Sequence, residues 1–101
     1  MSNGNVVMEL SFRIDASRQR EFRQHADVVL RGARPSGCLD RALFVRVGEP
    51  GVFLWVERWA SRQLLVPHLE SSTHRSLVGA IRVLGQLEAE HVVSLGGEVE
   101  S

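Results

Sequence analysis

Residues 52–60 restrict the fold more than any other segment of this chain, because they carry apolar side chains on both faces of an extended strand. Successive side chains of a strand point to opposite faces of its sheet. One face of this segment carries three aromatic residues and a carboxylate, and the other carries three aliphatic residues and a guanidinium: Phe53, Trp55, Glu57 and Trp59 against Val52, Leu54, Val56 and Arg58. Since a strand with this pattern is covered on both sides, each face of the sheet needs a covering layer.

Hydrophobic periodicity predicts the elements around this strand. Apolar residues alternate with period two in the predicted strands and recur every three or four residues in the predicted helices. Asp15 or Ser17 is a candidate N-cap for the first helix, and Ser61 and the polar run 71–73 are candidates for the next two. The predicted order is strand, helix, strand, strand, helix, helix, strand, over residues 6–14, 15–33, 39–47, 52–60, 61–70, 74–84 and 87–95.

This order predicts an α+β fold, a ferredoxin-like four-stranded antiparallel sheet with its helices on one face. No helix is left for the other face. We therefore expect a homodimer through the open sheet face. The expected organisation is one domain over residues 6–95, between a disordered N-terminus (1–5) and a Gly-rich, acidic C-terminal tail (96–101).

Composition excludes several classes of function. Twelve acidic residues balance twelve basic residues, so the chain lacks the positive field of a nucleic-acid or acidic-membrane binder. No apolar run approaches the ~18 residues that cross a bilayer. All the basic residues are Arg and Tyr is absent, which excludes Lys and Tyr chemistry. With the single Cys38 and no signal-peptide pattern, the expected location is cytoplasmic.

Several motifs in the chain resemble the antibiotic biosynthesis monooxygenase (ABM) family. The segment 53–61 (FLWVERWAS), followed by His68 and then by His74, is similar to the family's aromatic strand, its Glu-x-Trp motif and its two helical histidines. Residues 35–38 (PSGC) resemble the family's Pro-Gly-Cys entry into the second strand, with Ser36 inserted. The resemblance covers roughly residues 6–95 and implies that two ferredoxin-like subunits form a dimeric α/β barrel.

The resemblance implies a cofactor-independent monooxygenase that oxidises a small aromatic, quinol-like or enolisable compound, with no cofactor. Other family members degrade haem or isomerise a phosphorylated sugar. Haem degradation is disfavoured, because Leu10 stands where the haem-degrading branch has Asn and His68 stands where that branch has Trp. Without Tyr, the chain also cannot copy the Tyr-assisted mechanism of the polyketide-oxidising branch.

His68 and His74 are the candidate catalytic residues, because both fall on the inward stripes of their helices and could converge over the sheet. A histidine titrates near neutral pH, so we expect His68 to act as the base or the anchor of the substrate and His74 to act as the second polar group, which stabilises the anion. Apolar and aromatic residues are the candidate substrate-binding wall: Trp59, Trp55, Leu65 and Phe12.

Structural explanations compete with each of these roles. Inward histidines and tryptophans are also common as hydrogen-bonded core or dimer-interface residues, and Glu57 and Arg58 suit structural ion pairs. His25, His91 and Cys38 have no motif behind them, and the histidine spacing does not predict a metal site. A non-catalytic dimeric domain that binds a small ligand is therefore the alternative to the enzyme.

Overall fold

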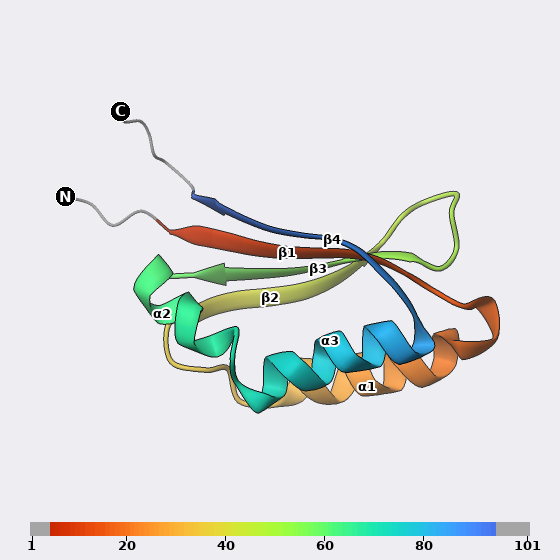
Figure 1. Ribbon diagram of the computed structural model, residues 1–101, viewed down its shortest axis with the longest axis horizontal. Helices are drawn as coiled ribbons and strands as arrows, with labels where there is room; N and C mark the ends of the chain where they lie inside the picture. The colour runs from red at the N-terminus through yellow and green to blue at the C-terminus, as the bar shows by residue number, and fades with distance from the viewer. Residues whose placement is uncertain (1–4, 95–101) are drawn as a thin grey trace.

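The computed structural model describes residues 5–94, and the N-terminal segment 1–4 and the tail 95–101 lie outside that range. The chain folds into a sheet with three α-helices, and Figure 1 shows the two long helices below the sheet and the short one at its left end in that view. The elements follow in the order β1 (Val6–Ile14), a 3₁₀ turn (Ala16–Arg18), α1 (Gln19–Arg31), β2 (Cys38–Val45), β3 (Val52–Trp59), α2 (Arg62–His68), α3 (Ser72–Leu84) and β4 (Gly85–Ser94).

The sheet is antiparallel with the strand order β2-β3-β1-β4, which is the ferredoxin-like arrangement. The central strand β1 buries alternate residues against the helices, as its period-two pattern predicts. Because residues paired across antiparallel strands share a face, the aromatic side chains of β3 lie on this same side. The predicted α+β class and the order of strands and helices are confirmed.

The core between the sheet and the helices is aromatic. The ring of Phe12 lies 5.1 Å from that of Phe22 on α1 and 5.6 Å from that of Phe53 on β3, measured between centroids. Helices α1 and α3 pack side by side over the sheet, and α2 lies at one end of it (Figure 1). Cys38 is buried at the start of β2, as expected for a small apolar side chain.

The predicted N-cap of the first helix is wrong. After β1 the chain first makes a 3₁₀ turn, in which the backbone N–H of Arg18 donates to the carbonyl oxygen of Asp15 at 2.8 Å. Neither Asp15 nor Ser17 caps α1, which begins only at Gln19. The caps at Ser61 and Ser71 are confirmed, because each hydroxyl accepts a backbone N–H of its helix.

The prediction of which residues of the last strand face the helices is also wrong for most of the strand. A β-bulge between β1 and β4 at Ser11/Phe12 shifts the register, so that Leu87 pairs with Phe12 but Glu90 pairs with Leu10. Leu10 and Phe12 both face the helices, and Glu90 therefore lies on the helix side. His91, expected on the apolar face with Leu87, lies instead on the open face opposite Glu9.

The open face of the sheet is covered by no helix among residues 5–94. Leu54 and Val56 of β3 are only partly exposed there, whereas Phe44 of β2 and Val93 of β4 are 54% and 47% exposed. The apolar character predicted for both faces of β3 is confirmed. The dimer that would cover this face stays a prediction.

Candidate functional site

Glu57 is the centre of a buried polar network on the helix side of β3. Its carboxylate accepts hydrogen bonds from the indole N–H of Trp55 at 2.8 Å and from that of Trp59 at 3.0 Å. The three residues lie two apart in a strand, so their side chains point to one face. A carboxylate held by two N–H donors can remain charged although it is only 3% exposed.

His68 lies over this carboxylate at the end of α2. Its Nε2 atom is 3.4 Å from Oε1 of Glu57, and its ring lies 4.8 Å from that of Trp59. On its other side, Nδ1 is 3.4 Å from the hydroxyl oxygen of Ser71. The imidazole is therefore held between a carboxylate and a hydroxyl, the arrangement that orients a histidine and selects its tautomer.

Burial alone would raise the pKa of Glu57. Its interactions with the His68 imidazole and with the two indole N–H groups outweigh that effect and hold the pKa of this carboxyl below its ordinary value of 4.5. Glu57 is thus a fixed negative charge beneath the helices.

His74 continues the network in the first turn of α3. Its backbone N–H donates to the Ser71 hydroxyl at 3.2 Å, and its ring lies 5.6 Å from that of His68. The Nε2 atom of His74 is 3.5 Å from Oε2 of Glu90. Burial and the neighbouring His68 lower the pKa of His74 below 6.5, although Glu57 and Glu90 oppose them. His74 is therefore neutral at pH 7 and able to accept a proton.

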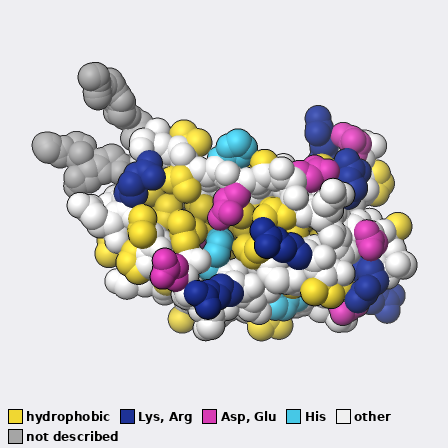
Figure 2. Space-filling model, in the orientation of Figure 1, with side chains coloured by type: hydrophobic (Ala, Val, Ile, Leu, Met, Phe, Trp, Pro, Cys, Tyr) yellow, Lys and Arg dark blue, Asp and Glu magenta, His cyan; other side chains and the backbone are white. Residues whose placement is uncertain are grey.

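The network reaches the surface in a groove between α3 and β4. This groove has a volume of about 370 Å³ and is lined by Leu69, His74, Arg75, Val78, Gly79, Arg82 and Glu90. Figure 2 shows a histidine and an acidic side chain next to each other among apolar side chains between the sheet and α3. The His74 side chain is 6% exposed, and the Glu90 side chain is 42% exposed. His74 is therefore the part of the network that a ligand in the groove would meet.

The structure brings some of the predicted site residues together. His68 and His74 lie side by side, with Trp59, Trp55 and Glu57 beneath His68. Leu65 is buried at the end of the core near them, on the same helix as His68. Phe12 instead belongs to the aromatic core with Phe22 and Phe53. The catalytic and substrate-binding roles of these residues stay predictions.

Three members of the network were not assigned a functional role from the sequence. Glu57 was expected to be a structural ion-pair residue, and its partners are a histidine and two indoles. The signal was present in the Trp-x-Glu-x-Trp spacing, which puts two N–H donors beside one carboxylate. No such signal marked Ser71 or Glu90. The contact of Ser71 with His68 depends on the junction between α2 and α3, and the position of Glu90 depends on the bulge between β1 and β4.

Residues 5–94 contain no group of three or more His, Cys, Asp or Glu side chains arranged to hold a metal ion. None of the helices among them is long and apolar enough to cross a membrane.

The fold and the buried network define a small ferredoxin-like α+β domain with a carboxylate–histidine pair beneath its helices. The chain belongs to the antibiotic biosynthesis monooxygenase family, whose model matches residues 5–80. The family predicted from the motifs is confirmed. None of the curated proteins compared with the chain matches it.

Solved structures with similar folds include three whose sequences are distant from this one. A conserved Bacteroides thetaiotaomicron protein, described as a possible oxidoreductase, superposes with a TM-score of 0.80 at 17% identity, covering 93% of this chain and 100% of its own. An antibiotic biosynthesis monooxygenase superposes with a TM-score of 0.74 at 21% identity, and the match covers 93% of this chain and 99% of the other. A mutant of SnoaB, a cofactor-independent oxygenase from Streptomyces nogalater, superposes with a TM-score of 0.78 at 14% identity, and the match covers 97% of this chain and 99% of the other. At these identities the likeness shows the fold.

Proposed function

We propose that this protein is a cofactor-independent monooxygenase that oxidises a small aromatic, quinol-like or enolisable compound, with a histidine as the base. The observation that carries the proposal is the position of His74, buried at the α3–β4 groove with His68 beside it and Glu57 behind His68. Membership of the family and the likeness to SnoaB, itself a cofactor-independent oxygenase, support it.

Between the two histidines, the geometry favours His74 as the base. It lines the groove, whereas His68 lies behind it and is in contact with Trp59 and Glu57. We assign to His68 and Glu57 the role of positioning residues, since the His68 ring packs against that of His74 and Glu57 lies behind His68. The carboxylates of Glu57 and Glu90 favour the imidazolium that forms when His74 takes a proton.

For a substrate with an activated CH₂ group next to a carbonyl or an aromatic ring, the proposed reaction begins when His74 removes a proton from that group. The carbanion reacts with O₂, one oxygen atom enters the substrate as a new carbonyl, and the other leaves as water. The two C–H bonds that break supply the four electrons, so no further reductant is needed. Arg75 and Arg82 line the groove and would favour the anionic form of the substrate.

Oxygen uptake with a panel of hydroquinones, anthrones and polyphenols tests this function. We expect the protein to consume O₂ without added metal or flavin, and His74→Asn to lower kcat/KM about 100-fold. His25→Asn, which changes a histidine on α1, is the matched control and should keep full activity. If the protein consumes no O₂ with any of these compounds, or if His74→Asn and His68→Asn are both as active as the parent, the enzyme proposal fails.

The non-catalytic alternative, a small-ligand-binding domain, is favoured by one observation. Trp55, Trp59 and His68 are packed in the core, where the same network would stabilise the fold without chemistry. Binding of a panel compound to the groove without O₂ uptake would support this alternative.

We further propose that the protein is a cytoplasmic homodimer that pairs through the open sheet face. The partly exposed Leu54 and Val56 at the centre of that face, and Phe44 and Val93 at its sides, give a second copy an apolar surface to cover. We expect Val56→Arg to convert a dimer to a monomer in sedimentation velocity. Val83→Arg, on the exposed side of α3, is the control and should leave the dimer intact. A parent protein that sediments as a monomer at micromolar concentration would contradict the proposal.

A further inference from the structure

A second pocket lies between α1 and the edge strand β2, at the opposite edge of the sheet from the α3–β4 groove. It has a volume of about 710 Å³, within the range of about 300–1,000 Å³ typical of small-molecule sites. Its lining residues are Arg20, Arg23, Gln24, Ala26, Asp27, Leu30 and Leu43. Nothing in the proposed oxygenase mechanism uses any of them.

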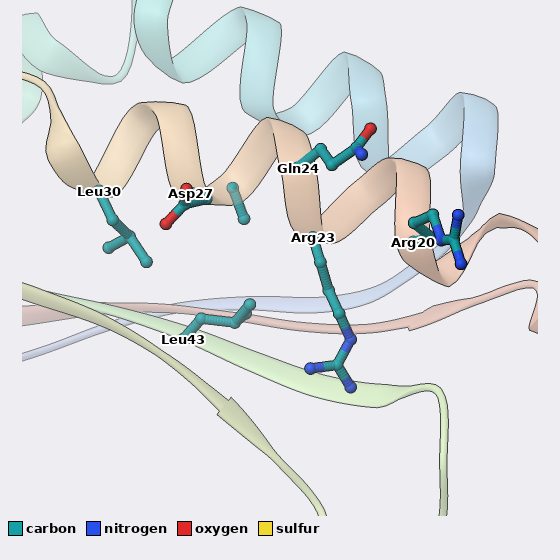
Figure 3. A pocket seen from close by; sticks show the side chains of 7 residues that line it. Arg20, Arg23, Gln24, Asp27, Leu30 and Leu43 are labelled. Carbon is teal, nitrogen blue, oxygen red and sulfur yellow. The ribbon is translucent and has the colours of Figure 1, made fainter.

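The inner part of this pocket is apolar. Figure 3 shows Leu30 of α1 pointing into the space between helix and sheet, and Leu43 of β2 lying along the sheet below it. Leu43 pairs with the buried Trp55 of β3, so the floor is continuous with the core. These side chains suit a flat hydrophobic or aromatic group.

The rim of the pocket carries excess positive charge. Within residues 5–94, Arg20 and Arg23 form no ion pair, and Arg23 reaches toward the sheet with its guanidinium carbon 5.3 Å from the centre of the Phe53 ring. The carboxylate of Asp27 is bound to Arg31 at 2.9 Å. Arg23 therefore reaches into the pocket and Arg20 lines its end one helical turn away, and neither has a matching carboxylate among residues 5–94.

We propose that the α1–β2 pocket binds a small aromatic carboxylate, with the ring between Leu30 and Leu43 and the carboxylate on Arg20 and Arg23. Guanidinium groups bind carboxylates with paired, charge-assisted hydrogen bonds, and the apolar floor selects for a ring. This site goes beyond the proposed function, because it stands at the other edge of the sheet and does not contain the histidine network.

Calorimetric titration of the full chain with naphthoate tests the proposal, with uncharged naphthamide as the matched ligand. We expect naphthoate to bind at least about tenfold more tightly than naphthamide, and the affinity for naphthoate to fall as salt is raised. The double variant Arg20→Gln/Arg23→Gln should weaken naphthoate binding at least about tenfold and leave naphthamide unchanged. Gln24→Glu, which adds a carboxylate at the exposed rim, should weaken naphthoate binding as well.

Arg82→Gln and His74→Asn, both in the α3–β4 groove, are the controls and should bind naphthoate as the parent does. Equal affinity for naphthoate and naphthamide, or an unchanged affinity in the double variant, overturns the proposal. A loss of naphthoate binding in Arg82→Gln also overturns it, because the anion would then occupy the other groove. Since none of these readouts is O₂ uptake, failure here is distinguishable from failure of the oxygenase proposal.

Discussion

Nε2 of His68 lies 3.4 Å from Oε1 of Glu57, with both side chains about 95% buried. A carboxylate at such a depth costs free energy unless it is paired and hydrogen-bonded, and Glu57 meets this condition through one imidazole and two indoles. The contact joins β3 to α2, so it contributes to stability and also orients the imidazole next to His74.

Glu57→Gln should therefore destabilise the fold. The amide keeps the shape of the side chain, but its NH₂ group cannot accept an indole N–H, so one buried donor is left without a partner. We expect the free energy of unfolding to fall by about 2–3 kcal/mol in urea denaturation. Glu88→Gln is the control, because its contact with Arg13 is exposed and contributes less than about 1 kcal/mol.

The contribution of Glu57 to the free energy of unfolding should depend on pH. Its folded pKa lies below 4.5, so as the pH falls the unfolded chain takes up the proton first. We expect the difference in the free energy of unfolding between the parent and Glu57→Gln to be complete above pH 4.5. This difference should disappear as the pH falls through the lower pKa of the folded state. An advantage that stays constant down to pH 3 would contradict this.

His74 should give a second pH dependence at higher pH. Its folded pKa is lowered below 6.5, so the unfolded state binds protons before the folded state does as the pH falls. Stability should therefore decrease as the pH is lowered from 7.5 through 6.5, and His74→Gln should reduce this slope. Denaturation series at fixed pH values measure it, and equal slopes in the two proteins would refute the expectation.

Glu90→Gln should shift the pH profile of oxygen uptake. The base must be neutral, so kcat/KM should fall on the acid side with a midpoint below 6.5. Since Glu90 raises the pKa of His74, its removal should move that midpoint to still lower pH. Glu88→Gln, on the same strand, should not move it. A midpoint that shifts upward in Glu90→Gln would argue against His74 as the base.

Gly37→Ala should be more harmful than Gly48→Ala. Both glycines have positive φ, +91° and +87°, so both variants bear the strain of a left-handed residue. A Cβ at Gly37 would lie 2.8 Å from Cβ of Leu64, whereas a Cβ at Gly48 meets no atom within 4 Å. We expect Gly37→Ala to lower the free energy of unfolding by about 1 kcal/mol more than Gly48→Ala. Equal losses in urea denaturation would show that the contact with Leu64 relaxes freely.

Much of the fold could be predicted because its signals are local. Alternation in residues 6–14 and 52–60, and helical spacing around Phe22 and Leu77, depend only on neighbours along the chain. Ser61 and Ser71 were recognisable as caps for the same reason. The start of α1 was missed, because a backbone hydrogen bond of a 3₁₀ turn replaced the expected side-chain cap.

Local sequence patterns were sufficient to predict the order and type of the elements, the apolar character of both faces of β3, and the presence of two inward histidines. The contacts that those histidines make depend on how distant elements pack together. Glu57 contacts His68 because α2 folds back over β3, and Glu90 reaches His74 because a bulge turns one face of β4 toward the helices. Periodicity reports which side of its own element a residue occupies, whereas contacts between elements depend on strand register and helix packing, which no local pattern encodes.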